Sequence, residues 1–420
     1  MTSIFKTRFK SVAAATFGNA LEWYDFGVYT FVAGILSKAF FPPGDDAAAL
    51  LATFAVFGLG FVVRPIGAAV LGRLGDVIGR KTPLVITMGL MGLGTLAIGF
   101  IPTYASIGIW APILLVCARL VQSFSVGGEF TTSITYLVEW APPEKRGFYG
   151  SLQQCGTNVG LLLGSGLAAL ASTLLDAPAM ASWGWRVLFI LGGLTGFVGL
   201  YMRRNVDETP VFQEARLTPA IDQPRKKLVG LAFKAYFLTA LGTTAFFVFL
   251  FYMPTFTQHY AHLSPTASLW SNTAGLLTLA TGIPISGYLS DRIGRKPLLI
   301  LGFSLVLLLA YPLFYLLGSG IALLAVVMVQ IFIGFIMSLY TGPSPATLVE
   351  LFPTRARSTY MAIGYTMATA TVGGFAPFIA TWLISYTGSP LAPTFYVMLA
   401  AVISLATAAS LRETAHEPLK

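Results

Sequence analysis

Long apolar runs separated by short polar segments dominate the sequence. Each run reaches the length of roughly 20 residues that a helix needs to cross the hydrocarbon core of a bilayer. Backbone groups in lipid must satisfy one another, so we expect helices, and the weak alternating pattern of an outer-membrane barrel is absent. The pattern predicts an all-α integral membrane protein with twelve transmembrane helices. The predicted spans are 12–39, 47–75, 82–102, 108–139, 147–176, 184–203, 229–258, 266–289, 297–318, 321–349, 358–386 and 391–411.

The composition agrees with a membrane protein. Hydrophobic residues make up 55% of the 420-residue chain and charged residues 10%, whereas soluble domains carry about 25% charged residues. The apolar run after the basic flank 1–10 is too long for a signal peptide, so we expect that flank to stay attached. Lys and Arg outnumber Asp and Glu by 26 to 17, mainly at the chain ends and in alternate loops. The positive-inside rule therefore places both termini in the cytoplasm and argues against a nucleic-acid partner.

Two segments of the sequence recur in its second half. GRLGDVIGRK at 72–81 returns as GYLSDRIGRK at 287–296, and EWAPPEKRGFY at 139–149 returns as ELFPTRARSTY at 350–360. Parallel repeats of this kind are typical of carriers whose two halves enclose a substrate site near the middle of the membrane. A pore needs no such duplication.

The repeat predicts two similar six-helix bundles, 1–203 and 229–420, joined by a polar cytoplasmic linker, 204–228. The repeated loop also provides candidates for a cytoplasmic gate, because a carboxylate and an arginine can form a charge-assisted bond that holds one side closed. The alternative is that its basic residues only fix topology. The candidate gate residues are Asp76, Arg80, Asp291 and Arg295.

These motifs resemble a known family. GRLGDVIGRK is similar to the loop signature of the major facilitator superfamily, and GNALEWYDF, FVVRPIGAAVLG, SIGIWAPILL, RLVQSFSVGGE, KRGFYGS, WGWR and DETP together resemble its metabolite:proton symporter family. That family includes citrate, α-ketoglutarate, shikimate and proline/betaine carriers. One departure is Gln122-Ser123, where the family usually has Gln-Gly, so a hydroxyl is added at a packing or pocket position.

The resemblance implies a twelve-helix secondary transporter that imports a small solute with protons by alternating access. TTAFFVFLFYMPTF and ATATVGGFAPFIATWLISYTGSP look most like citrate and tricarballylate carriers, whereas GNALEWYDFGVYTFVA and the closing RETAHEPLK look like the osmolyte carrier. We expect a citrate-like tri- or dicarboxylate as the substrate. The alternative is a zwitterionic osmolyte such as proline or betaine.

Five ionisable residues fall inside predicted spans: Glu22, Asp25, Arg64, Arg119 and Glu129. Such groups cost at least a few kcal/mol at the membrane centre, so they normally face a cavity and have a partner. From the helical rise, Asp25 and Arg119 lie about 20 and 17 Å along their spans, close to the midplane. We expect Asp25 to be the proton site and Arg119 its counter-charge, as in related sugar:proton symporters. Arg119 is also a candidate for binding a substrate carboxylate. The alternative is a static ion pair.

The other three charged residues have less defined roles. Arg64 suits bidentate binding of a substrate carboxylate, unless it only pairs with Glu129. Glu129 is otherwise a second proton relay. Glu22, one turn before Asp25, shares the cavity or contacts backbone at the helix interface.

Polar and aromatic residues on other spans complete the predicted substrate site. Each of them has the alternative of helix-to-helix packing. They are Gln154, Asn158, Thr243, Thr244, Phe247, Tyr340, Ser344, Tyr365 and Thr369.

No nucleotide loop or metal motif stands out, so we expect neither an enzyme nor a cofactor, with protons as the coupling ion. A channel is the other rival class, and the duplicated halves argue against it. The expected partners are the organic acid and the lipid bilayer. We expect a monomer in the cell inner membrane.

Overall fold

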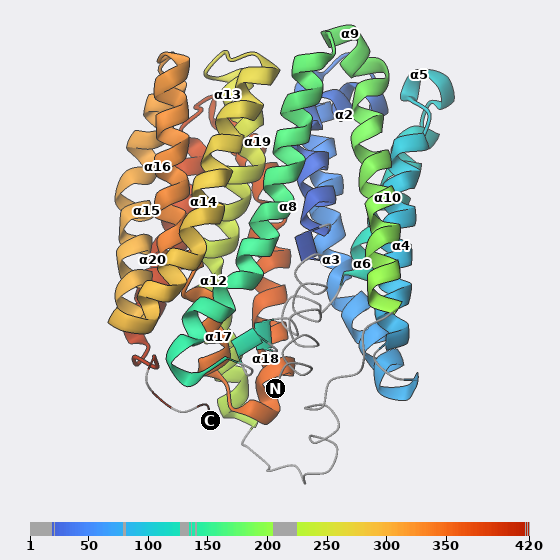
Figure 1. Ribbon diagram of the computed structural model, residues 1–420. Coiled ribbons are helices and arrows are strands. Elements are labelled where there is room, and N and C mark those ends of the chain that lie inside the picture. Colours follow the sequence, from blue (N-terminus) through green and yellow to red (C-terminus); the bar gives the residue numbers. More distant parts are fainter. Residues whose placement is uncertain are drawn as a thin grey trace.

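The computed structural model describes residues 19–20, 22–78, 81–126, 134–135, 137–138, 141–204, 225–415, 417 and 419. This part of the chain is helical and contains no β-strand. The helices run along one common direction and form a tall bundle (Figure 1). The all-α prediction is therefore confirmed.

The first half of the chain begins with a helix over 22–31 that turns at Val32. The helices that correspond to the predicted spans 47–75, 82–102, 147–176 and 184–203 match them within a few residues. The elements that follow are α2 (Ala33–Phe40), α3 (Asp46–Ile78), α4 (Lys81–Phe100), α5 (Tyr104–Ile107), α6 (Trp110–Ser125), the 3₁₀ turn η1 (Pro143–Lys145), α8 (Arg146–Leu174), α9 (Ala177–Ala179), the π-helical η2 (Met180–Gly184) and α10 (Trp185–Arg204).

The second half contains the described helices that follow the predicted linker, most of which, 205–224, lies outside the described residues. Three of its predicted spans are interrupted. The elements are α12 (Arg225–Phe246), η3 (Phe247–Tyr252), α13 (Met253–His259), α14 (Pro265–Ile293), α15 (Arg295–Gly318), α16 (Leu323–Thr341), α17 (Ser344–Leu351), α18 (Thr354–Ala368), η4 (Thr369–Gly373), α19 (Ala376–Thr387) and α20 (Ala392–Ser410).

The interruptions are of two kinds. The segments η3 and η4 are π-helical, a departure from the regular helix that is frequent at functional sites. Between α16 and α17 the chain turns at Gly342-Pro343, because a proline within a helix lacks the amide hydrogen that continues the ladder. All three breaks place irregular backbone in helices that line the cavity described below.

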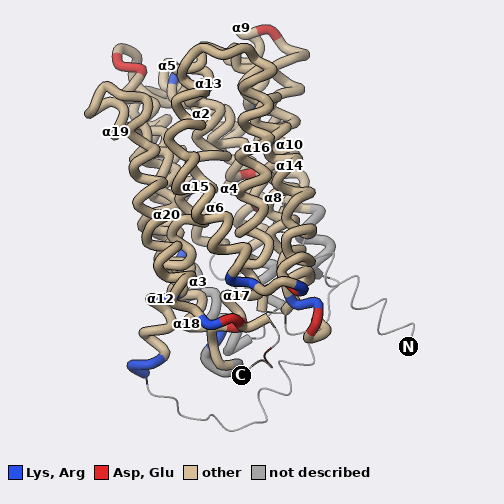
Figure 2. The backbone as a smooth tube through the Cα atoms, turned by 90° about the vertical axis from the view of Figure 1, so that its left-hand side faces the viewer, with Lys and Arg blue, Asp and Glu red and all other residues tan. Residues whose placement is uncertain are grey.

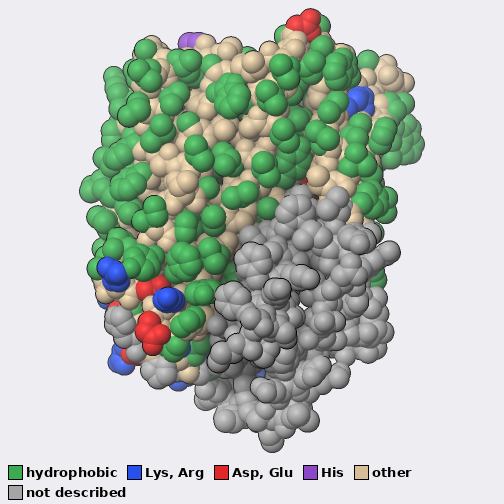
Figure 3. Space-filling view, in the orientation of Figure 1, with side chains coloured by type: hydrophobic (Ala, Val, Ile, Leu, Met, Phe, Trp, Pro, Cys, Tyr) green, Lys and Arg blue, Asp and Glu red, His purple; other side chains and the backbone are tan. Residues whose placement is uncertain are grey.

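Seven helical runs among the described residues are long and apolar enough to cross a membrane. Large hydrophobic side chains are exposed along their length, as lipid-facing side chains would be, and they cover much of the face in Figure 3. Lys and Arg gather at the end of the bundle where the chain's C-terminus lies, with fewer charges elsewhere (Figure 2). The chain is a multi-pass membrane protein, and the number twelve stays a prediction.

Helices of each half pack mainly against one another, and α8 and α14 lie side by side where the halves meet (Figure 1). Close approach depends on small residues, as is usual between membrane helices. A Cβ at Gly60 on α3 would lie 2.3 Å from Oγ of Ser123 on α6. The unusual Ser123 hydroxyl is therefore accommodated by a glycine on the facing helix, in the helix interface.

Candidate functional site

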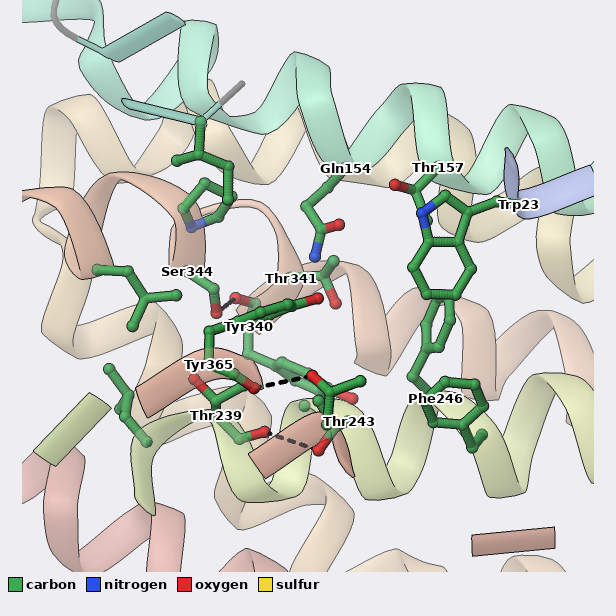
Figure 4. A pocket seen from close by; sticks show the side chains of 17 residues that line it. Trp23, Gln154, Thr157, Thr239, Thr243, Phe246, Tyr340, Thr341, Ser344 and Tyr365 are labelled. Atoms are coloured by element: carbon green, nitrogen blue, oxygen red, sulfur yellow. Dashed lines mark hydrogen bonds between the residues drawn. The ribbon is translucent and has the colours of Figure 1, made fainter. Parts of the chain in front are cut away.

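A cavity lies between the two halves of the chain (Figure 4). Its walls come from helix 22–31, residue 134 and α8 on one side and from α12, η3, α16, α17, α18 and η4 on the other. No Asp, Glu, Lys or Arg is among these described residues. The lining residues are Trp23, Ile134, Gln154, Thr157, Leu238, Thr239, Gly242, Thr243, Phe246, Phe247, Tyr340, Thr341, Ser344, Pro345, Leu348, Tyr365 and Thr369.

The structure brings most of the predicted uncharged site residues to this cavity. Asn158 and Thr244 do not line it: the Asn158 amide donates to the Gln154 carbonyl at 2.8 Å, and the Thr244 hydroxyl faces the Val372 carbonyl at 3.4 Å. Thr244 follows Thr243 by one residue, and the turn of about 100° between them directs it to a neighbouring helix instead. The predicted residues that do line the cavity are Gln154, Thr243, Phe247, Tyr340, Ser344, Tyr365 and Thr369.

Sequence reasoning missed Trp23, Thr157, Thr239, Phe246 and Thr341, which also line the cavity. The sequence contains enough information to predict two of them. Thr157 lies three residues after Gln154 and Thr239 four residues before Thr243, so helical periodicity places each on the same face as a predicted residue.

Three buried polar atoms of the cavity wall have no hydrogen-bond partner in the structure: Trp23 Nε1, Thr239 Oγ1 and Tyr340 Oη. Each can donate a hydrogen bond. A buried donor without a partner costs about 1–3 kcal/mol, so all three gain if a ligand supplies an acceptor. Trp23 and Phe246 also meet edge to face with ring centres 5.3 Å apart. The wall thus combines free donors with aromatic rings.

Arg64 lies next to the cavity and does not line it. Its Nη2 is 3.6 Å from Oε1 of Glu22, and both side chains are buried. Its Cζ lies 4.2 Å from the centre of the Phe61 ring and 4.5 Å from that of Phe26, within the range of a cation–π interaction. The charge of Arg64 is therefore stabilised within the protein by the Glu22 carboxylate and by two aromatic rings. Glu129, its expected alternative partner, lies outside the described residues.

Asp25 and Arg119 are both buried, as expected, but they are linked indirectly. Thr95 on α4 donates to Oδ2 of Asp25 at 2.6 Å, and Gln122 on α6 donates to the Thr95 hydroxyl at 2.7 Å. Arg119 in turn donates through Nη1 to Oε1 of Gln122. Thr95 and Gln122 thus stand between the aspartate and the arginine. Neither was predicted as a site residue. Gln122 lies three residues after Arg119 on α6, so helical periodicity places the two on one face, whereas no spacing rule relates Thr95 on α4 to either Arg119 or Asp25.

The charged end of the bundle carries contacts between the two halves. Asp291 at the end of α14 accepts hydrogen bonds from the backbone amides of Gly147, at 2.7 Å, and Phe148, at 2.9 Å, in the first turn of α8. Arg295 contacts Asp291 at 2.8 Å and Glu350 at 3.2 Å. Of the predicted gate residues, Asp291 and Arg295 therefore form a buried cluster. The Asp76 side chain and Arg80 lie outside the described part.

The C-terminal segment after α20 joins this cluster. Oε1 and Oε2 of Glu413 accept the backbone amides of Arg295 and Lys296, at 3.0 and 2.9 Å, and Thr414 donates to Oε2 of Glu350 at 2.6 Å. Partial burial alone would raise the pKa of Glu413, but these amides and those of Thr414 and Ala415 hold that pKa below its ordinary value.

Two helical halves around a polar cavity, with buried charges beside it and ionic contacts between the halves at one end, define a membrane carrier. A model of the Major Facilitator Superfamily matches residues 15–367 and 235–420. The chain belongs to this superfamily.

Relatives agree with this assignment. The proline/betaine transporter of Salmonella typhimurium is 37% identical, with 98% of this chain and 85% of the relative covered. The citrate-proton symporter of Klebsiella pneumoniae is 35% identical, with 95% and 90% covered. The solved structure of the proton:xylose symporter XylE bound to 6-bromo-6-deoxy-D-glucose is similar with a TM-score of 0.79 at 19% identity, covering 98% of this chain and 97% of that one. These relatives are transporters and not enzymes.

Proposed function

We propose that this protein imports a small zwitterionic solute, such as proline or betaine, together with protons across the inner membrane. The observation that carries the proposal is the cavity wall, which has aromatic rings and neutral donors and no charged side chain among its described residues. A site without charges favours a ligand whose own charges cancel, because an uncompensated charge away from water is costly. From the sequence we expect a citrate-like acid first; the uncharged cavity wall and the similarity to proline/betaine transporters support the zwitterionic alternative.

The groups of the wall suit the two ends of such a ligand. The donors Trp23 Nε1, Thr239 Oγ1 and Tyr340 Oη are the candidates for binding a carboxylate. The rings of Phe246 and Tyr365 are candidates for the cationic end, since cations are attracted to aromatic faces within about 6 Å of the ring centre. Similarity to proline/betaine transporters over nearly the whole chain supports the same substrate class.

A citrate-like acid is the second candidate. The 35% identity to a citrate-proton symporter favours it, and so does Arg64, whose Cζ lies 5.8 Å from the centre of the Trp23 ring in the cavity wall. Nε and Nη2 of Arg64 have no hydrogen-bond partner, so they could donate to a carboxylate. Against this candidate, Glu22 already offsets the charge of Arg64 at 3.6 Å, and Arg64 does not line the cavity.

Alternating access assigns roles to the remaining residues. In the proposed cycle Asp25 takes up and releases the coupling proton, and the contacts of Asp291 with α8 separate when the charged end of the bundle opens. No cofactor takes part. The monomer is the transporting unit in this proposal.

Purified protein in proteoliposomes tests the substrate and the coupling together. Labelled proline, betaine and citrate are offered with and without an inwardly directed proton gradient. We expect saturable, gradient-driven accumulation of proline or betaine and none of citrate. Accumulation of citrate alone would establish the second candidate. Equal uptake of proline or betaine with and without the proton gradient would overturn the proposed coupling.

A further inference from the structure

Four buried polar side chains form an unbroken hydrogen-bonded chain across three helices. The chain runs from Arg119 to Gln122 on α6, then to Thr95 on α4, and ends at Asp25 on helix 22–31. The exposed fractions are 2% for Asp25 and 0% for the other three residues. Solvent therefore does not compete for these bonds, and each side chain constrains the next.

The direction of the chain is fixed by Arg119. A guanidinium only donates, so the Gln122 side chain must present its oxygen to Arg119 and its NH₂ group to Thr95. The Thr95 oxygen accepts that bond, and its single hydrogen is left for Oδ2 of Asp25. With Asp25 ionised, every bond in the chain therefore donates toward it.

Thr95 also has a second acceptor for its hydrogen. Its hydroxyl lies 3.0 Å from the carbonyl of Met91, one turn earlier on α4. When Asp25 binds a proton on Oδ2, that oxygen becomes a donor to Thr95, and the Thr95 hydrogen must turn to Met91. The hydroxyl oxygen has two lone pairs, so it must then accept from both Asp25 and Gln122. Thr95 therefore has one bonding pattern with ionised Asp25 and another when Oδ2 carries the proton.

The other groups around Asp25 cannot replace this link. From α10, a Cβ at Gly192 would lie 2.2 Å from Oδ1, so backbone closes that side. On helix 22–31, which carries Asp25 itself, the Tyr24 hydroxyl donates to the Leu188 carbonyl at 2.9 Å, and Glu22 forms an ion pair with Arg64. From α6, the charge of Arg119 acts on Asp25 across Thr95 and Gln122.

We propose that Thr95 and Gln122 are positioning residues that transmit the protonation state of Asp25 to Arg119. The inference rests on the proposed proton coupling. The transported proton binds to an oxygen of Asp25 and leaves from it, and none passes along the chain. What passes is a change in hydrogen bonding: loss of the anion weakens the bonds from Gln122 and then from Arg119, which frees α6 to move relative to helix 22–31.

Three variants test the transmission in proteoliposomes. Thr95→Val and Gln122→Met remove the polar links while keeping the side-chain size, and Thr95→Ser keeps the hydroxyl. Thr257→Val is the matched control, because the Thr257 hydroxyl is also fully buried and bonds only to carbonyls of its own helix, at 3.0 and 3.3 Å. Substrate exchange without a gradient and accumulation driven by a proton gradient are measured for each.

We expect proton-driven accumulation to fall about tenfold or more in Thr95→Val and Gln122→Met, the size expected for a hydrogen bond to a charged group. Exchange should stay near the wild-type rate. The pH profile of uptake should move to higher pH in Thr95→Val, because an ionised carboxylate that loses a donor is less stable. Thr95→Ser and Thr257→Val should behave as wild type. Normal accumulation with an unchanged pH profile in Thr95→Val would overturn the inference.

Infrared difference spectroscopy of the purified protein separates this inference from the proposed function, because it needs no transport. A pH step in the wild type should give a carboxyl band that is lost in Asp25→Asn, together with an amide band that is lost in Gln122→Met. In Thr95→Val the carboxyl band should remain and the amide band should disappear. An amide band that survives in Thr95→Val would refute the transmission, whatever the transport assays show.

Discussion

Removing the Tyr340 hydroxyl should weaken substrate binding and at the same time stabilise the empty protein. Tyr340 is 1% exposed, and its Oη has no hydrogen-bond partner. The ring packs on Phe303 with centres 5.2 Å apart and remains in Tyr340→Phe. A bond from this hydroxyl to a substrate carboxylate would contribute about 1.5–3 kcal/mol, which corresponds to a Kd roughly 10- to 150-fold higher in the variant. The unpartnered hydroxyl costs about 1–3 kcal/mol in the empty state.

The two effects have opposite signs, which distinguishes a ligand-binding hydroxyl from a packing one. Titration calorimetry gives the Kd for proline or betaine, and the thermal unfolding midpoint without substrate gives the stability. The matched control is Tyr396→Phe, because the Tyr396 hydroxyl donates to the Val372 carbonyl away from the cavity. That variant should lose about 0.5–1.5 kcal/mol of stability and keep its affinity. Wild-type affinity in Tyr340→Phe would remove this hydroxyl from the substrate site.

Three further predictions concern the charged residues. Asp25→Asn should abolish proton-driven accumulation but retain exchange of internal for external substrate, and uphill uptake by the variant in proteoliposomes would contradict its role as the proton site. Arg64→Lys should lower the unfolding midpoint, because lysine loses the planar stacking on Phe26 and Phe61. The Kd for the substrate should change little. A tenfold weaker Kd at unchanged stability would place Arg64 at the substrate. The pKa of Glu413 is lowered in the folded protein, so its stabilising contacts should be present at neutral pH and lost as the pH falls below about 4.3, the ordinary value for Glu. The stability difference between wild type and Glu413→Gln should shrink over that range, and a constant difference would show that ionisation of Glu413 is irrelevant.

The helices were predictable from the sequence because lipid leaves the backbone few alternatives. The positions of α3, α8, α14 and α15 agree with the predicted spans within a few residues. The internal breaks were not predicted. The π-helical turns at 247–252 and 369–373 precede Pro254 and Pro377, which lie in the first turn of α13 and of α19. A proline marks a helix start in the sequence, but it does not specify a π-helical turn before it.

The site was predictable where it depends on one helix and unpredictable where it depends on several. Thr243 and Phe247 follow from spacing along one helix, and both line the cavity. Depth along the helices predicts that Asp25 and Arg119 lie near one another, and two side chains link them in the structure, but depth along a helix carries no information on rotation about it. Of the two side chains between them, Gln122 follows from its spacing of three residues from Arg119, but Thr95 comes from another helix, whose rotation only packing fixes.

The arrangement of charges explains how a carrier can keep two arginines beside a neutral cavity. Arg64 has Glu22 as a direct partner, whereas Arg119 reaches Asp25 through two neutral side chains. The Phe26 ring lies next to both guanidinium groups, 4.5 Å from Cζ of Arg64 and 4.6 Å from Cζ of Arg119. Neutralising Asp25 therefore removes the anion of only one arginine and leaves the other pair intact. In the proposed cycle, a substrate with cancelling charges binds beside this cluster without separating Glu22 from Arg64, and protonation of Asp25 changes the network around Arg119.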